Sequence, residues 1–138
     1  MLRGLLVLLL LGIVCASGCS KQPKIYRVTG TVTRSNEPVP NLIVRFFPEH
    51  GRPSWGQTNA QGEFELQYDL QTKGAVEGKH KVFIEFMAAD PGEEHALKTG
   101  TSPEYKERKA LAEKYNEVNS PLQAVVEKDN QKIHLQIE

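Results

Sequence analysis

The chain of 138 residues has few cysteines, no net charge and no hydrophobic run long enough to cross a bilayer. Its two cysteines, Cys15 and Cys19, lie close together near the start, so the remainder of the chain offers no disulfide framework. Lysine plus arginine and aspartate plus glutamate both number 17, which leaves no positive field to attract nucleic acid. The composition therefore excludes a disulfide-stapled miniprotein and argues against a nucleic-acid partner.

The longest apolar run extends from Leu5 to Val14 and follows a single basic residue, Arg3. As a helix this run would span roughly 15 Å, about half of the hydrocarbon core of a bilayer. A basic residue, a short apolar block and then small residues are typical of a secretory signal peptide. We therefore expect residues 1–18 to be a cleaved signal. An uncleaved membrane helix is the alternative, which the length of the run disfavours.

The segment "ASGC", from Ala16 to Cys19, resembles the lipobox of bacterial lipoproteins. The resemblance implies that the Cys19 thiol receives a diacylglyceryl group and that the chain is cut just before this residue. Ser17 and Gly18 supply the small side chains that such a peptidase requires, whereas Cys15 follows a bulky valine. The alternative is an ordinary signal peptide, whose removal would leave a soluble secreted protein with a free cysteine near its start.

Residues 19–24, "CSKQPK", would then form a short lipidated tether with no apolar side chain to bury beyond the cysteine. Two acyl chains are enough for stable anchoring without a transmembrane segment. Ser20 stands where aspartate marks inner-membrane retention in enteric lipoproteins, so the resemblance implies an outer-membrane or outer-surface position. We expect an exported protein that is anchored to a bacterial membrane through acylated Cys19.

From residue 25 onward, apolar residues recur at every second position between turn residues, as Val28 and Val32 do around Gly30. This pattern predicts β-strands and, over residues 25–138, one all-β domain with a β-sandwich fold. Turns are expected at 59–62 and, within a final hairpin, at 128–131. Further strands follow at segments 42–47, 63–68, 82–86 and 122–137, the last a hairpin of two strands, and the turn segment 49–58 runs into a short strand. This gives about seven strands in total.

Residues 88–120 interrupt the strand pattern with a polar insertion. A serine followed by a proline is a favourable helix start, which predicts one short helix over residues 103–115. Leu111, Tyr115 and Val118 would form its narrow apolar stripe. We expect this stripe to dock on the sandwich.

Three segments resemble, in order, the motifs of carboxypeptidase-regulatory-like, or transthyretin-like, domains of small bacterial lipoproteins. They are "VTGTVTRSNEPVPNLIVRFF", "GQTNAQGEFEL" and "GAVEGKHKVFIEF". The resemblance covers most of residues 26–137. It implies a seven-stranded Greek-key β-sandwich that serves as an accessory or binding module. Independently of the family, Gly30 suits a place where a ring or backbone crosses the strand closely, and Gly62 suits a turn with positive φ.

Enzymatic activity is not expected. The transthyretin-like fold also carries 5-hydroxyisourate hydrolase, whose resemblance requires a C-terminal "YRGS" and an early histidine, yet this sequence ends in "HLQIE" and its first histidine is His50. No separate catalytic domain of the zinc carboxypeptidase type fits the chain. The other histidines, His80, His95 and His134, form no pair at ligand spacing, so neither a metal site nor any cofactor is expected. We expect His80 and His134 to point outward or to lie at a strand edge.

Trp55 is the one tryptophan of the chain. Together with Tyr26 and Tyr68 it could stack on a sugar or clamp a peptide, but we expect it to cover the open end of the sandwich. The sequence thus predicts a non-enzymatic, membrane-anchored envelope lipoprotein whose sandwich serves as a protein-interaction or structural module, with an envelope protein as partner. The alternative is a carbohydrate-binding module at the cell envelope that uses these aromatic residues against a polysaccharide.

Overall fold

The computed structural model describes residues 22–138. These residues form ten strands and two helices, in the order β1 (Ile25–Tyr26), β2 (Val28–Arg34), β3 (Glu37–Pro38), β4 (Leu42–Pro48), β5 (Ser54–Gln57), β6 (Glu63–Glu65), β7 (Ala75–Val76), β8 (Gly78–Phe86), α1 (Pro91–Thr99), α2 (Tyr105–Lys114), β9 (Gln123–Val126) and β10 (Gln131–Ile137). The sequence predicted about seven strands. The structure has three more because β1, β3 and β7 are only two residues long, too short for a period-two pattern to register.

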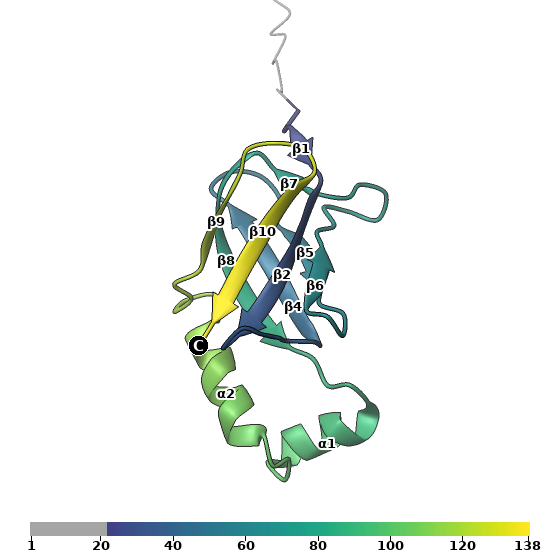
Figure 1. The fold of residues 1–138 in the computed structure, drawn as a ribbon, viewed down its shortest axis with the longest axis vertical. Coiled ribbons are helices and arrows are strands. Elements are labelled where there is room, and N and C mark those ends of the chain that lie inside the picture. The colour runs from purple at the N-terminus through teal and green to yellow at the C-terminus, as the bar shows by residue number, and fades with distance from the viewer. Residues whose placement is uncertain (1–21) are drawn as a thin grey trace, which may run out of the picture.

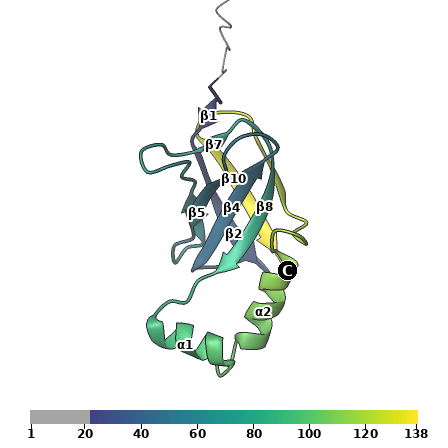
Figure 2. The same cartoon turned by 180° about the vertical axis from the view of Figure 1, so that it is seen from behind.

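Two four-stranded sheets make the sandwich (Figures 1 and 2). The first sheet has the order β10–β2–β3, and β6 also pairs with β2 on the side of β3. The second sheet has the order β5–β4–β8–β9. Strands β1 and β7 form a small separate ribbon at one end. The all-β sandwich expected from the alternating pattern is thus the architecture of the described chain.

The core lies between the sheets and is filled by the residues that the alternation predicted to point inward. Val28 and Val32 of β2, and Leu42, Val44 and Phe46 of β4, are fully buried. This inward set continues on the other strands with Phe64, Leu66, Val82, Ile84, Leu135 and Ile137. Burial of each large apolar side chain contributes about 1.5–3 kcal/mol, so this shared face fixes which side of each strand points inward.

Gly30 lies where two neighbouring strands come closest to β2. A Cβ at this position would lie 2.2 Å from the carbonyl oxygen of Ile133 and 2.4 Å from Cζ of Phe64. The expectation that a ring or backbone crosses the strand here is confirmed, because both do. The expected turn at residues 59–62 is also confirmed: the Gly62 amide donates to the Asn59 carbonyl at 2.9 Å, and Gly62 has φ 69°.

The predicted final hairpin is wrong. Strand β9 pairs antiparallel with β8 in the second sheet, whereas β10 pairs in parallel with β2 in the first sheet, so the turn between them crosses from one sheet to the other. Side-chain hydrogen bonds hold this crossing. The Gln131 side-chain oxygen accepts from the Glu127 amide at 2.9 Å, and Asp129 accepts from the Arg27 amide at 2.7 Å. Alternation identifies a strand but not its partner, and two strands joined by a short turn need not pair.

The insertion contains two helices where the sequence predicted one. Helix α1 is capped by Asp90, whose carboxylate accepts from the amides of Gly92 at 2.7 Å and Glu93 at 2.9 Å, and it ends at Gly100 in the left-handed conformation. An aspartate followed by proline and, nine residues later, by glycine is a start and stop signal, so the sequence did carry this helix. Helix α1 has no fully buried residue, so its sequence needs no apolar stripe and shows only weak apolar periodicity.

Helix α2 docks on the sandwich through Leu111 and the adjacent Tyr115, which are both buried in the core cluster. The Tyr115 carbonyl accepts from the Ile84 amide of β8 at 3.0 Å. Val118, expected on the same stripe, is instead 81% exposed. The helix has ended before Val118, because the Asn116 side chain accepts from the amides of Val118 and Asn119 and forms a turn.

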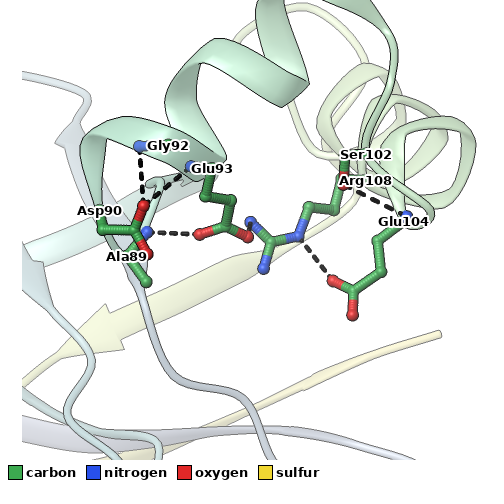
Figure 3. Close-up of polar contacts among 7 residues, drawn as sticks. All are labelled: Ala89, Asp90, Gly92, Glu93, Ser102, Glu104 and Arg108. Atoms are coloured by element: carbon green, nitrogen blue, oxygen red, sulfur yellow. Dashed lines mark hydrogen bonds and ion pairs between the residues drawn. The ribbon is translucent and has the colours of Figure 1, made fainter.

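Arg108 connects the two helices (Figure 3). Its Nη1 lies 2.8 Å from Glu93 of α1, and its Nε donates to Glu104 at 3.1 Å. Nη1 makes no hydrogen bond to Glu93, so this contact is a Coulombic attraction. The helix pair lies at the end of the sandwich opposite to β1, where the described part of the chain begins (Figures 1 and 2).

Candidate functional site

Trp55 lies on the outward face of β5 and is 44% exposed. Its neighbours Ser54 and Gly56 point inward, and a Cβ at Gly56 would lie 2.7 Å from the Glu65 carbonyl oxygen. The two sheets approach so closely at this edge that no ring fits between them. The expectation that Trp55 covers the open end of the sandwich is therefore wrong, and the ring faces solvent.

The backbone of Trp55 joins the two sheets. Its amide donates to the Gln67 carbonyl at 3.0 Å, and the Gln67 amide donates back at 2.7 Å. On its other side Trp55 pairs with Arg45 of β4, and Arg45 in turn pairs with Phe83 of β8. Directly paired residues point to the same face of a sheet, so Trp55, Arg45 and Phe83 form one row on the face turned away from the core. Within this row Phe83 is covered and only 6% exposed.

Arg45 is the charged centre of this row. Its guanidinium donates to both oxygens of Glu85, through Nε at 2.9 Å and Nη2 at 3.1 Å. Phe47 and Phe83 lie beside it with ring centroids 4.6 Å apart and planes inclined at 41°. Lys81 Nζ lies 5.5 Å from the centroid of the Phe83 ring. A fixed guanidinium–carboxylate pair thus lies next to two aromatic rings.

A groove of about 570 Å³ opens beside this row, and we call it the Arg45 groove. The second sheet forms one wall, and α2 with the segment that follows it forms the other. Lys81 holds that segment in place by donating to the carbonyls of Glu117 at 2.9 Å and Val118 at 3.1 Å. The lining residues are Arg45, Phe47, Phe83, Ile84, Glu85, Phe86, Ala112, Asn116 and Glu117.

The two tyrosines that the sequence grouped with Trp55 do not share its row, although Tyr68 directly follows Gln67, the residue that pairs with Trp55. Tyr26 belongs to β1 and packs, half-buried, against the core. Tyr68 is half-buried in a loop, with the Arg52 guanidinium 5.9 Å from its ring centroid. Among the described residues no ring contact joins either tyrosine to Trp55. The residues that do accompany Trp55 are Arg45 and Phe83, which only the pairing of β5, β4 and β8 brings beside it.

His80 is buried, which contradicts the expectation that it points outward. It lies in phase with Val82 and Ile84, so its side chain enters the core beside the Phe46 ring, at a centroid distance of 5.7 Å. Its Nε2 donates to the Val76 carbonyl at 2.7 Å, and Nδ1 has no partner among the described residues. Burial lowers the pKa of His80 below its ordinary value, and the hydrogen bond to Val76 only partly opposes this.

His134 points outward from β10, as expected, and lies between two threonine hydroxyls of β2. Nδ1 is 2.8 Å from Thr31 Oγ1, and Nε2 is 3.1 Å from Thr33 Oγ1. A general base that activates a hydroxyl usually has a carboxylate on its second nitrogen, whereas His134 has another hydroxyl there. A second groove of about 700 Å³ lies here, lined by Thr29, Gly30, Thr31, Gln57, Asn59, Glu63, Phe64, Glu65, Lys132, Ile133 and His134.

Within residues 22–138 no three histidine, cysteine, aspartate or glutamate side chains gather as metal ligands would. Cys19, the predicted lipidation site, lies outside the described residues, as do the predicted signal and most of the tether. No helix of the described chain is both long and apolar enough to cross a membrane. No known family model, curated protein or solved structure matches this chain.

Proposed function

We propose that this protein is a non-enzymatic, lipid-anchored lipoprotein of the bacterial cell envelope that binds another envelope protein through the Arg45 groove. The signal-like residues 1–18 and the lipobox-like segment ending at Cys19 support export and anchoring. The described chain begins at one end of the sandwich and carries α1 and α2 at the other (Figure 1). An anchor near the start therefore holds the sandwich at the membrane with its helix pair directed away.

The exposed Trp55, paired across the strands with Arg45, is the observation that carries the protein-binding proposal. Tryptophan and arginine are the residues most enriched among those that dominate binding energy at protein interfaces. Arg45 is already oriented by Glu85, so a partner does not have to immobilise it, and the Phe47 ring adds half-buried apolar surface. The N–H groups of Arg45 that Glu85 does not use can donate to an unpaired backbone carbonyl or a carboxylate of a partner.

The fold supports a transthyretin-like, Greek-key class for this sandwich, which we propose on the motifs together with their geometry. Gly30 admits the crossing of the Phe64 ring, and Asn59 accepts through its side chain from the amides of Gln61 and Glu63, both at 2.9 Å. The motif residues thus stabilise the turn and the packing of the core. Their presence does not require a ligand.

In-cell photocrosslinking tests the protein-binding proposal. A photoreactive phenylalanine analogue replaces Glu117, an exposed residue that lines the Arg45 groove. Adducts with one recurrent protein are expected, and Trp55→Ala should reduce them about tenfold, as the loss of a dominant interface residue does. Val125→Ala is the matched control, because Val125 is 42% exposed on the outward face of β9 in the same sheet. Equal adduct yields in the two variants would refute the assignment.

The anchor is tested in the same cells. Mass spectrometry of the N-terminal peptide should show a diacylated Cys19, and Cys19→Ser should move the protein out of the membrane fraction. An unmodified Cys19, or unchanged fractionation of the variant, would refute the lipoprotein proposal. Neither result depends on the Arg45 groove.

Carbohydrate binding is the second candidate, and the exposure of the Trp55 ring favours it. Sugars stack on exposed aromatic faces and bond to neighbouring polar groups, and Arg45, which pairs with Trp55, binds the carboxylate of Glu85. Because Trp55 is the only tryptophan, its fluorescence reports on this surface alone. Quenching by one member of a panel of envelope glycans, abolished in the Arg45→Ala variant, would support this function. Unchanged emission across the panel would count against it.

A further inference from the structure

Strand β10 forms the longest unpaired sheet edge of the described chain. It pairs with β2 over seven residues, from Gln131 opposite Val28 to Ile137 opposite Arg34. No described strand pairs with its other side. The opposite side of the first sheet is occupied by β3 and β6, and it continues to β5 through Gln67.

The direction of each backbone group on β10 follows from two hydrogen bonds. The Gln131 amide donates to the Arg27 carbonyl at 3.2 Å, so odd-numbered residues direct their amides and carbonyls toward β2. The Glu138 amide, in the other phase, donates away from β2 to the Tyr115 hydroxyl at 2.9 Å. Lys132, His134 and Gln136 therefore direct both backbone groups away from β2. Among the described residues no partner accepts from or donates to them.

In contrast to β10, the neighbouring edge of the second sheet, formed by β9 and the end of β8, is covered. The Gln131 side chain donates to the Val125 carbonyl of β9 at 2.7 Å. The Ser120 hydroxyl donates to the Val82 carbonyl at 2.5 Å, and the Tyr115 carbonyl accepts from the Ile84 amide. These side chains and loop groups occupy positions that an added strand would need. Long open strand edges promote aggregation, and proteins usually cover them. The three residues of β10 with unpaired backbone groups therefore indicate that another strand covers this edge.

We propose that β10 receives an extended segment of a partner protein, which adds as a further strand to the first sheet beside β10, on the side away from β2. Three residues with free amide and carbonyl groups offer six hydrogen bonds, which an extended backbone satisfies and a helix or small molecule does not. The outward side chains of Lys132, His134 and Gln136 are exposed and would lie beside the added strand. Lys132 has no ion-pair partner among the described residues, so an acidic residue opposite it completes the pairing.

A second copy of the chain is the competing occupant, and its geometry is unfavourable. Two identical β10 edges related by a twofold axis pair antiparallel. Strand β10 runs from the β1 end of the sandwich toward the helix end (Figure 1). Antiparallel pairing would therefore place the two chain starts at opposite ends of the complex. Two lipids at Cys19 could then not enter the same membrane, so this inference rests on the proposed anchoring.

The test places the photoreactive phenylalanine analogue at Gln136 of the full-length protein in cells. The key variant is His134→Pro, which removes an amide that points away from β2 and so leaves the ladder with β2 intact. The matched control is His134→Ala, which loses the same contacts to Thr31 and Thr33 but keeps the amide. Thermal unfolding of both purified proteins in detergent verifies that they fold.

Adducts at Gln136 are expected to fall about tenfold in His134→Pro and to stay within about twofold of the unmutated level in His134→Ala, because only proline removes the strand-pairing donor. The crosslinked partner peptide should contain an acidic residue within two positions of the attachment point. Equal adduct levels in both variants, or adducts with a second copy of the chain, would overturn the inference. Absent adducts at Gln136 with adducts retained at Glu117, in the Arg45 groove, would overturn it and leave the proposed function standing. Absent adducts at both positions would overturn both.

Discussion

Replacing Gly30 by alanine should strongly destabilise the sandwich, because the added methyl group has no room in the core. The new Cβ would lie 2.2 Å from the Ile133 carbonyl oxygen and 2.4 Å from Cζ of Phe64, well inside van der Waals contact. The Phe64 ring can tilt, but the carbonyl belongs to the ladder between β10 and β2 and cannot move without breaking hydrogen bonds. Either β10 shifts away from β2 or the core opens around Phe64.

Overpacking a core by one methyl group usually costs about 1–3 kcal/mol, and contact with backbone places this site at or above the upper end. We therefore expect a loss of about 3 kcal/mol in the free energy of unfolding, which corresponds to a fall of roughly 10 °C in Tm for a domain of this size. Small domains have only about 5–15 kcal/mol in total, so the effect is large.

Urea titration of the purified protein, followed by circular dichroism, measures this loss. The control is Gly78→Ala, because Gly78 has φ 125° but no heavy atom lies within 4 Å of the position that its new Cβ would occupy. Its cost is backbone strain alone, about 1–3 kcal/mol, and gives the scale against which crowding is judged. A second comparison adds Phe64→Leu to Gly30→Ala. The combined loss should be smaller than the sum by about 1 kcal/mol, since one of the two clashes is removed.

The reasoning would be refuted if Gly30→Ala changed the free energy of unfolding by less than about 0.5 kcal/mol, the range of ordinary surface substitutions. It would also fail if Phe64→Leu restored full stability in the double variant. That result would mean that the Ile133 carbonyl moves freely, and β10 would then not be fixed by β2.

Three further predictions concern single side chains. The pKa of buried His80 is lowered, so below pH 6.5 the unfolded state binds more protons than the folded state. The free energy of unfolding should therefore fall as the pH drops below 6.5, by at most about 1.4 kcal/mol per pH unit. In urea titrations, His80→Gln should remove this dependence of the free energy of unfolding on pH. Arg108→Ala should accelerate amide exchange in α1 while leaving the strands unchanged, because it removes the link to Glu93; uniform acceleration would contradict this. Tyr115→Phe should cost about 0.5–1.5 kcal/mol through the lost bond to Glu138, and a neutral result would contradict that bond.

Several features of the fold could be predicted from residues that act locally. The alternation of Val28, Gly30 and Val32 identified a strand and its buried face, and Asn59 with Gly62 identified a turn. Each of these properties depends on a residue and its immediate neighbours in the chain. The start and stop of α1 at Asp90 and Gly100 were equally local, although the weak apolar face of that helix hid it.

The candidate site could be predicted only in part. Trp55 was recognisable as the sole tryptophan, but its exposure depends on Glu65, whose backbone approaches Gly56 from the other sheet. Its true companions, Arg45 and Phe83, belong to strands that are distant along the chain. His80 was misplaced for a similar reason, because its phase within β8 was misjudged although Val82 and Ile84 carried the answer.

By itself the sequence determined where most strands and turns lie and which of their faces are apolar. It also predicts an anchor at Cys19, which lies outside the described residues. The tertiary structure decided which strands pair: β10 leaves β9 and joins β2 in parallel, which creates the open edge. The physical reason is that alternation acts over two residues, whereas pairing depends on how the apolar faces of the two whole sheets fit together.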